Sequence, residues 1–278
     1  MSYIRVLFAR VRSTLSSCEP TKMKRIIRQF TTYPSRYTNF ALIGKPGSGK
    51  GTYGKLLATR LGCPLVVVGD VLRAHVKEGS ELGKKIDAYQ RHGKLVDDQT
   101  VTEALLSYLN FIFTDKTKRE TKFGFILDGF PRTVKQAQMI DNSFKQTSND
   151  MDWPEQFQLN YVVDIDVPDW ICIDKILGRR NCRVCHCAFN ISDINKAPFR
   201  MPPQLPIPYP CDKCDMDNAW EKRIDDDENI VVQRLKEFRE KSKPVSKYFQ
   251  DSGRLLTFVP YNGIADIHIL EKLVVDKS

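Results

Sequence analysis

The sequence predicts an α/β fold: a parallel five-stranded sheet flanked by helices, with two inserts. The main indication is an apolar run at residues 40–43 that ends at a loop with glycines at 44, 47, 49 and 51, followed by helix-forming residues up to 61. Short apolar runs then alternate with helical segments, which is typical of parallel sheets with right-handed crossovers. A chain of 278 residues, 41% of them hydrophobic, can bury the core of one large domain or of one domain with an insert.

The expected elements follow one another along the chain. Strands are expected at residues 40–43, 64–68, 121–128, 159–167 and 255–259. Helices are expected at 52–60, around Arg73, within 79–115 with a break at 92–94, from Thr133 onward, and at 169–177, 229–250 and 264–275. The first half of 79–115 has too few apolar residues to pack on a sheet and predicts a helical insert, whereas 142–157 are polar and predict a surface loop. Residues 181–221, with six prolines between 198 and 210, predict a separate small module.

The glycine loop has the composition of a phosphate-binding site. Gly44 and the Gly49-Lys50 pair have the spacing at which backbone N–H groups and a helix N-terminus surround phosphate oxygens, while the lysine neutralises their charge. Glycine allows positive φ and a close approach of the backbone to the anion. The position after the lysine, which commonly offers a hydroxyl to Mg²⁺, is Gly51, and the hydroxyl follows at Thr52. We therefore expect a metal here to be held mainly by phosphates and water.

The net charge of +9 is concentrated near the N-terminus. Residues 1–38 hold eight Arg or Lys and one acid, so they contribute +7, and the other 240 residues carry only +2. This argues against a nucleic-acid surface on the folded body. The leader 1–38 is also rich in Ser and Thr, with apolar residues between arginines at 3–11, which predicts a mitochondrial transit peptide for the matrix or intermembrane space. The alternative is a basic tail without an address, which would leave the protein cytoplasmic.

The sequence predicts neither a membrane span nor a disulfide framework. No apolar run approaches the roughly 20 residues that a span needs. Five of the eight cysteines fall within 33 residues, which favours a metal site in a reducing compartment. Two CxxC pairs separated by 25 residues predict a structural zinc site with four ligands: Cys182, Cys185, Cys211 and Cys214. The alternatives are free thiols, or His186 or Cys187 in place of one ligand; Cys63 and Cys172 lie in apolar runs and are expected in the core.

Five motifs, in order and at similar spacing, resemble those of adenylate kinases. They are residues 44–52, 69–73, 128–133, 178–180, and Arg223-x-Asp225-Asp226 followed by Arg234. The resemblance covers 39–278 and is closest to the long-lid type with a zinc-bearing lid. It implies a core domain at 39–278, containing a helical insert for the nucleoside monophosphate at 69–98 and a lid at 179–225. It also implies reversible, Mg²⁺-dependent phosphoryl transfer from ATP to AMP by a monomer, with no nucleic-acid or membrane partner.

The same resemblance implies roles for individual residues. Catalytic roles fall to Lys50, Asp128, Arg132, Arg179, Arg223 and Arg234. The donor nucleotide is expected at Gly44, Pro46, Gly47, Ser48, Gly49, Lys50, Gly51, Thr52, Lys175, Arg179 and Gly263. The acceptor is expected at Val68, Gly69, Arg73, Lys94, Val96, Gly129, Arg132, Gln136, Arg223 and Arg234. Asp128 matches the acid that orients Mg²⁺ through water, and Gln136 matches a contact with the acceptor base.

The chemistry independently requires such residues. Two polyanionic nucleotides must be held in line and charge on the transferred group must be stabilised, so several fixed cations are needed but no strong general base. Arginine suits this task because its planar fork binds phosphate oxygens with two hydrogen bonds and stays charged. Lys50 and six arginines, Arg180 included, lie in the matching motifs.

Two departures from the family pattern concern the substrates. Val68 stands where the family has Thr or Ser, which removes one hydrogen bond to the acceptor base. Lys175 stands where many members have an arginine stacked on the donor base, so a GTP:AMP phosphotransferase is an open alternative. A pyrimidine monophosphate kinase typically has a shorter lid than is found here. A zinc-ribbon nucleic-acid-binding protein with a nucleotide switch is a further alternative, against which the near-neutral body and the acidic stretch 225–228 argue.

Overall fold

The chain divides into two compact units, residues 1–35 and 36–278. The computed structural model describes residues 38–92, 96–114, 124–146, 159–184, 188–205, 220–223 and 226–277. The leader 1–38 therefore lies almost wholly outside the described residues, and the fold described below is that of the second unit.

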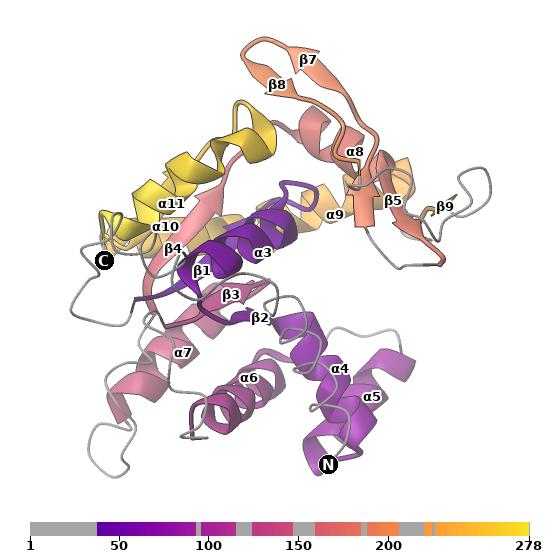
Figure 1. Ribbon diagram of the computed structural model, residues 1–278. Helices are drawn as coiled ribbons and strands as arrows, with labels where there is room; N and C mark the ends of the chain where they lie inside the picture. Colours follow the sequence, from indigo (N-terminus) through magenta and orange to yellow (C-terminus); the bar gives the residue numbers. More distant parts are fainter. Residues whose placement is uncertain are drawn as a thin grey trace, which may run out of the picture. The chain divides into compact units, whose positions relative to one another are not determined.

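Among the described residues, the central sheet has five strands, all of them parallel to their neighbours. They are β1 (Asn39–Gly44), β2 (Leu65–Val67), β3 (Ile126–Asp128), β4 (Leu159–Ile165) and β10 (Leu255–Phe258). The order is β10-β4-β1-β3-β2, with β1 at the centre (Figure 1). The predicted parallel sheet is confirmed. Four predicted strands are too long: Val68 begins a helix, residues 124–125 precede β3 without belonging to it, and the predictions at 159–167 and 255–259 run past the ends of β4 and β10.

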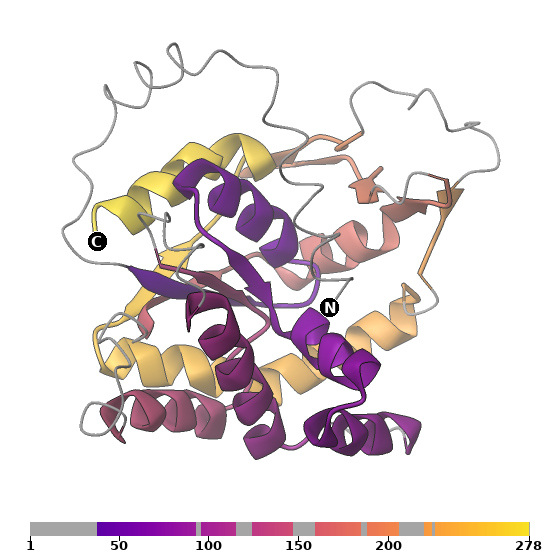
Figure 2. The same cartoon turned by 60° about the horizontal axis from the view of Figure 1, so that its bottom comes forward.

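Helices cover both faces of this sheet. Alternate residues of β1 point to opposite faces, because side chains alternate along a strand. Phe40 and Leu42 pack with α3 (Lys50–Leu61) and α11 (Ile267–Val275). Ala41 and Ile43 pack in the cluster formed with α6 (Asp98–Thr114), α7 (Val134–Gln146) and α10 (Lys243–Asp251) (Figure 2). Residues of β1 are buried along its whole length, so the strand that carries the glycine loop is the most enclosed part of the sheet.

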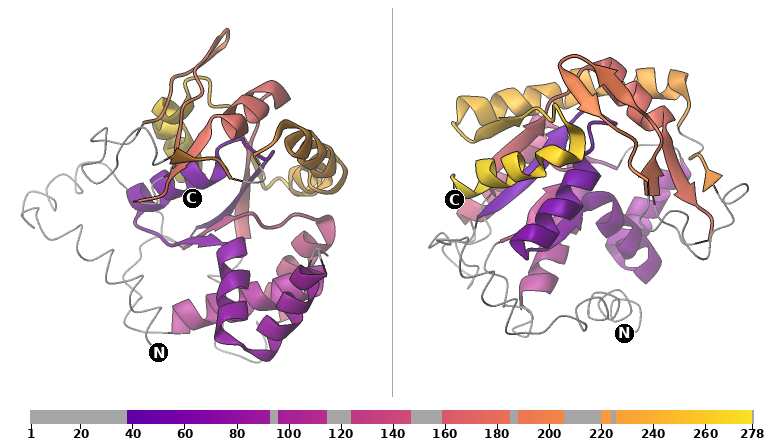
Figure 3. Two further views of the ribbon diagram at one scale, coloured as in Figure 1. Left: turned by 90° about the vertical axis from the view of Figure 1, so that its right-hand side faces the viewer. Right: turned by 45° about the horizontal axis from the view of Figure 1, so that its top comes forward.

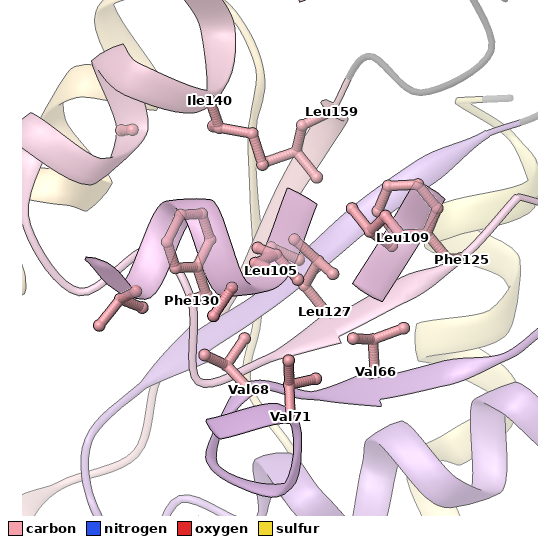
Figure 4. Packing of buried hydrophobic residues seen from close by; sticks show 14 of the residues in the cluster. Val66, Val68, Val71, Leu105, Leu109, Phe125, Leu127, Phe130, Ile140 and Leu159 are labelled. Carbon is pink, nitrogen blue, oxygen red and sulfur yellow. The ribbon is translucent and has the colours of Figure 1, made fainter. Parts of the chain in front are cut away.

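The second of these clusters joins elements that are far apart in sequence. Leu105 and Leu109 of α6, Leu127 of β3 and Phe130 after it are all fully buried (Figure 4). Ile140 of α7 and other labelled residues line the same cluster. At roughly 1.5–3 kcal/mol per fully buried large apolar side chain, this packing fixes the chain that follows β3 relative to the sheet.

Two of the three helices that follow β2 form the first insert. The chain after β2 continues directly into α4 (Val68–Glu78) and α5 (Glu81–Arg91), then α6. α4 and α5 approach closely at Gly83, where an added Cβ would lie 1.9 Å from the carbonyl oxygen of His75. The expected helical insert is therefore present, although α6 belongs to the sheet-packed core. Gly93 and Lys94, within the predicted break, lie outside the described residues.

The second insert contains short strands that the sequence did not predict. It follows α8 (Asp169–Leu177). Within the described residues, a three-stranded sheet has the order β6-β5-β9, from β5 (Arg179–Cys182), β6 (Ala188–Asn190) and β9 (Trp220–Glu221). A hairpin, β7 (Ile194–Lys196) with β8 (Phe199–Met201), projects beside it (Figure 3). The strands have two to four residues each, too short for a period to stand out in the sequence.

Three helix predictions are wrong in their bounds. The helix expected at 229–250 is two helices, α9 (Glu228–Lys241) and α10, separated at Ser242. Pro244 lies in the first turn of α10, where a proline is tolerated because its missing N–H would have no partner there. α7 continues through Gln146 into the segment expected to be a loop, and a 3₁₀ turn, η4 (Gly263–Asp266), precedes α11. In the described part of the chain no helix is both long enough and apolar enough to span a membrane.

Candidate active site at the carboxyl edge of the sheet

The glycine loop follows β1 and needs glycine for two separate reasons. Gly44, Gly47 and Gly49 have φ values of 140°, 85° and 93°, which L side chains rarely adopt. An added Cβ on Gly47 would lie 2.4 Å from the carbonyl oxygen of Cys172, so the loop packs directly against α8. Gly49 precedes α3, and the first N–H groups of that helix face the loop. Ser48 is buried, and its hydroxyl has no hydrogen-bond partner among the described residues.

Lys50 is held at the centre of the loop. Its Nζ donates hydrogen bonds to the carbonyl oxygens of Gly44 (2.6 Å) and Lys45 (2.8 Å). Burial lowers the pKa of Lys50 to about 8, while the carboxylates of Asp128 and Asp164 favour its charged form. The ammonium group is thus poorly hydrated and fixed in place, which suits it to neutralise an incoming anion.

Asp128 is the last residue of β3 and Asp164 the second-to-last residue of β4, the two strands that flank β1. Asp128 pairs in register with Leu42 and Asp164 with Ile43, so both lie at the carboxyl edge beside the loop. An added Cβ on Gly51 would lie 3.4 Å from Asp128 Oδ2, which brings this carboxylate over the first turn of α3. Burial raises the pKa of Asp128, and Lys50 and Arg132 oppose that shift. Sequence analysis missed Asp164; the signal was an acid inside an otherwise apolar strand.

Arg132 follows β3 in a tight turn. Its Nε donates to the carbonyl oxygen of Gly129 (3.0 Å), and its backbone N–H donates to Gln136 Oε1 (2.8 Å). The surrounding protein desolvates the guanidinium and lowers the pKa of Arg132; Asp128 opposes the shift and Arg234 of α9 adds to it. Arg132, Asp128 and Arg234 are therefore close enough to interact electrostatically, although they come from three separate segments.

Gln136 is buried and fully engaged in the structure. Its Nε2 donates to Asp98 Oδ1 (2.8 Å), and its Oε1 accepts from Arg132. The chain Asp98–Gln136–Arg132 links α6 to the turn after β3. The contact of Gln136 with an acceptor base remains a prediction.

Arg179 lies at the start of the second insert and is paired with an acid at its end. Its Nε donates to Asp226 Oδ2 (2.9 Å), and its Nη2 donates to the other oxygen. The Asp226 side chain is completely buried, whereas 27% of the Arg179 side chain is exposed. Arg180 donates to the carbonyl oxygens of Leu177 and Arg179 instead (both 2.8 Å). Asp226 was visible in the sequence motif, but its pairing with Arg179 was not predictable.

The remaining predicted acceptor residues are more dispersed. Arg73 is 68% exposed and pairs with Asp70 on the same helix, with its guanidinium next to Gly69. Val68 is buried in the core at the start of α4. Arg223 is exposed before α9, and Val96 precedes α6, just after residues 93–95, which lie outside the described residues. Lys94 lies outside the described residues.

Two predicted donor residues lie near the second insert. The carbonyl oxygen of Lys175 accepts from Asn190 Nδ2 (2.7 Å), and burial lowers the pKa of Lys175, an effect opposed by Asp193. Gly263 has φ +62°, and an added Cβ would lie 3.3 Å from Met201 Cβ, so η4 packs on the β7–β8 hairpin. Of the remaining predicted loop residues, Pro46 lies between β1 and α3, whereas Thr52 lies in the first turn of α3.

The predicted zinc ligands are described only at one position. Cys182 ends β5, is buried, and accepts a hydrogen bond at its Sγ from the N–H of Val184 (3.4 Å). Cys185, Cys211 and Cys214 lie outside the described residues. Among the described residues, no three His, Cys, Asp or Glu side chains are grouped so as to hold a metal ion. The predicted core positions of Cys63 and Cys172 are confirmed, since both are buried.

Comparisons with known proteins agree with the motifs. The family model for adenylate kinase matches residues 42–254. The chain is 36% identical over 214 residues to the adenylate kinase of Gloeobacter violaceus, covering 77% of this chain and 87% of that protein. It is 34% identical over 239 residues to the adenylate kinase of Thermosipho africanus, covering 86% of this chain and 98% of that protein. It is also 32% identical over 249 residues to "Adenylate kinase 1, chloroplastic" of Arabidopsis thaliana, covering 87% of this chain and 79% of that protein. The chain, with its glycine loop, Lys50 and Asp128 at one edge of a parallel sheet, belongs to the adenylate kinase family of enzymes.

Proposed function

We propose that this protein catalyses reversible transfer of the terminal phosphoryl group from ATP to AMP, giving two nucleoside diphosphates. One observation carries the proposal: Lys50, Asp128 and Arg132 act electrostatically on one another at the carboxyl edge of the sheet, and Arg234 of α9 acts on Arg132, although the four span 185 residues of sequence. A set of cations converging beside a phosphate-type loop is what this transfer requires, since the chemistry is mainly positioning and charge stabilisation. The names of the relatives support AMP as the acceptor.

In this proposal the glycine loop and Lys50 bind the donor phosphates. Gly44, Gly47 and Gly49 allow the backbone to approach phosphate oxygens, and the Lys50 ammonium, already poorly hydrated, gives up little water when it meets them. Adenylate kinases generally use Mg²⁺, which supplies charge neutralisation on the phosphates. The residues fit such an ion: the Asp128 carboxylate lies over the first turn of α3, beside Gly51, where it would hold the ion's water ligands.

The arginines are assigned by the motifs they occupy. Arg179, Arg223 and Arg234 would surround the transferred group, and Arg73 and Arg132 would bind the acceptor phosphate, Arg73 after leaving Asp70. Exposed pairs such as Arg73 with Asp70 are worth little, about 0–1 kcal/mol, so a phosphate would displace the carboxylate readily. The inserts at 69–98 and 179–225 are proposed to close over the two nucleotides and exclude water, which limits hydrolysis.

The test is an assay of purified protein with each donor and acceptor pair. ATP, GTP or ITP is combined with AMP, GMP, CMP or UMP in the presence of Mg²⁺, and nucleoside diphosphate formation is followed. We expect activity with AMP, and Lys50→Ala and Arg132→Ala to lose a factor of about 10³ or more in kcat. GTP is the second candidate donor because Lys175, half-buried and near Asp193, offers no flat surface to stack on adenine. Activity that is absent with every pair would exclude the proposal.

We also propose a structural zinc ion at Cys182, Cys185, Cys211 and Cys214. The N–H of Val184 that donates to Cys182 Sγ supports a thiolate at that position, since hydrogen bonding favours a charged acceptor. A metal with four thiolates would stabilise the second insert by roughly 10 kcal/mol or more. Metal analysis should find one zinc per chain, and a chelator should lower the melting temperature. Metal-free protein with an unchanged melting temperature would contradict this assignment.

The leader and the partners remain separate proposals. Residues 1–38 are proposed to direct the chain to mitochondria, and the alternative is a cytoplasmic protein. A fluorescent fusion with and without 1–38 tests this, because only a functional leader changes the location.

The protein is further proposed to act as a monomer without nucleic acid. Sedimentation and filter binding to RNA and DNA at physiological salt test these two points, and tight salt-sensitive binding without kinase activity would favour the zinc-ribbon alternative.

A further inference from the structure

Lys45 joins the glycine loop to the chain beside it. It follows Gly44 directly, and only 22% of its side chain is exposed. Its Nζ donates to the carbonyl oxygen of Val167 (2.8 Å) and lies 3.1 Å from Asp169 Oδ1. Asp166 is a weaker partner, with an N–O distance of 3.7 Å and an exposed carboxylate. The side chain is therefore committed to the junction between β4 and α8.

The backbone of the same residue supports the interior of the loop. The carbonyl oxygen of Lys45 accepts hydrogen bonds from Lys50 Nζ (2.8 Å) and from the N–H of Ser48 (3.1 Å). Where that carbonyl points thus decides where the Lys50 ammonium is held. Because side chain and carbonyl belong to one residue, anchoring the first restricts the second.

Asp169 connects this anchor to a third element. It lies in the first turn of α8 and accepts from Lys45 and from Arg239 of α9. Burial of the Asp169 carboxyl favours its neutral form, but hydrogen bonds from Lys45 and Arg239 outweigh this and hold its pKa below the usual value. α8 leads to Arg179 at its C-terminal end, and α9 carries Arg234. The Lys45–Asp169–Arg239 cluster therefore touches the loop and both helices that border the second insert.

We propose that Lys45 is a positioning residue of the donor site, whose ion pair with Asp169 holds the glycine loop, and through it Lys50, in place relative to α8 and α9. Lys45 does not contact the phosphates in this arrangement. The inference rests on the proposed function, because it concerns how the same site binds its donor. In this arrangement the contact between Lys45 and Asp169, rather than the charge of Lys45, sets the affinity for the donor nucleotide.

Two substitutions with opposite effects on charge separate these possibilities. Lys45→Met removes a positive charge near the donor phosphates, whereas Asp169→Ala removes a negative one and leaves Lys45 charged. If long-range charge were decisive, the first would weaken donor binding and the second would strengthen it. If the contact is decisive, both weaken it. The sign of the Asp169→Ala effect therefore decides between the two.

The experiment measures KM for ATP and for AMP, kcat and melting temperature in the full chain. Lys45→Met and Asp169→Ala are each expected to raise the KM for ATP about tenfold, the effect of losing a hydrogen bond between charged groups, with the KM for AMP changed less than about twofold. The double variant should bind ATP no more weakly than the weaker-binding single variant, because both substitutions remove the same contact between Lys45 and Asp169. Lys45→Arg, which keeps the ion pair, should restore ATP binding to within about threefold.

A matched control is available at Lys272. Its Nζ pairs with Asp276 at 2.6 Å on the exposed surface of α11, so Lys272→Met removes the same charge and an ion pair at a different place. It should leave both KM values unchanged. Three results would overturn the inference: a lower KM for ATP in Asp169→Ala, no change in either variant, or parallel rises of both KM values that follow the loss of melting temperature.

Failure of the proposed function gives a different result. If the unmodified chain does not phosphorylate AMP, the catalytic proposal fails regardless of Lys45. Calorimetric binding of magnesium–ATP without acceptor then tests the positioning role alone, with the same expected tenfold weakening in Lys45→Met. If the unmodified chain is active and Lys45→Met binds ATP normally, only the positioning role is excluded.

Discussion

Replacing Asp226 by Asn should destabilise the second insert, because Arg179 would keep its charge but lose its only carboxylate partner in the described residues. The Asp226 side chain is fully buried and accepts from both Nε and Nη2 of Arg179. Removing one member of a buried pair costs about 3–5 kcal/mol, because the other charge is left uncompensated. Since 27% of the Arg179 side chain is exposed, water compensates part of that loss, and about 2–3 kcal/mol is expected.

Urea unfolding followed by circular dichroism measures this change. With a slope of about 2–3 kcal/mol per molar urea, the midpoint should fall by about 1 M. Glu221→Gln is the matched control. It breaks the pair of Arg183 with Glu221 (3.2 Å) in the same small sheet, but there both side chains are exposed, so less than about 1 kcal/mol should be lost.

Two outcomes would refute this reasoning. One is an Asp226→Asn midpoint indistinguishable from that of the unmodified chain. The other is equal losses for Asp226→Asn and Glu221→Gln, since burial is the feature that distinguishes the two pairs. Under the proposed function, kcat should also fall in Asp226→Asn and remain unchanged in Glu221→Gln, because only Arg179 is assigned to the transferred phosphoryl group.

Three further predictions concern the loop and the core. Burial lowers the pKa of Lys50 to about 8, so its charged fraction, and with it kcat/KM for the donor, should fall about tenfold per pH unit above pH 8. A pH–rate profile that stays flat to pH 10 would contradict this. Gly47→Ala should abolish donor binding measured by calorimetry, because the Cβ would meet the carbonyl of Cys172 at 2.4 Å. Gly62→Ala, with φ +65° and no atom within 4 Å, should cost only about 1–2 kcal/mol in urea unfolding and leave binding intact. Phe249→Ala should cost about 3–5 kcal/mol in the same unfolding assay, because Phe249 of α10 is fully buried in the cluster that contains Ala41 and Ile43, and a loss below 1 kcal/mol would contradict this.

The sheet was predictable from the sequence because its strands are short apolar runs that end at recognisable turns. The run at 40–43 followed by the glycine loop located β1, and the carboxyl edge followed from the parallel alternation of strands and helices. The break between α9 and α10 was missed, although the sequence carries one signal for it. Pro244 marks a helix start, and the spacing of apolar residues across 229–250 concealed it.

The pairing of site residues was not predictable from the sequence. Arg179 and Asp226 are 47 positions apart, and several arginines and acids near the second insert could have paired in other ways. Lys45 gave no signal at all, because a lysine in a phosphate-type loop is expected to serve the phosphate. Its actual partners come from a turn 122 and 124 residues later, and only the folded arrangement brings them together.

The position of the two inserts has a consequence for how the fold can vary. Each insert begins after a strand or helix at the carboxyl end of the sheet, and the chain returns to that end after it. Neither insert therefore interrupts the hydrogen bonding between the five strands. α8 and α9 lie next to each other, and the Arg179–Asp226 pair joins the two ends of the second insert between them. The residues between Arg179 and Asp226 can be lengthened, shortened or exchanged without disturbing one hydrogen bond of the central sheet. The second insert is therefore the natural place for related chains to differ in length.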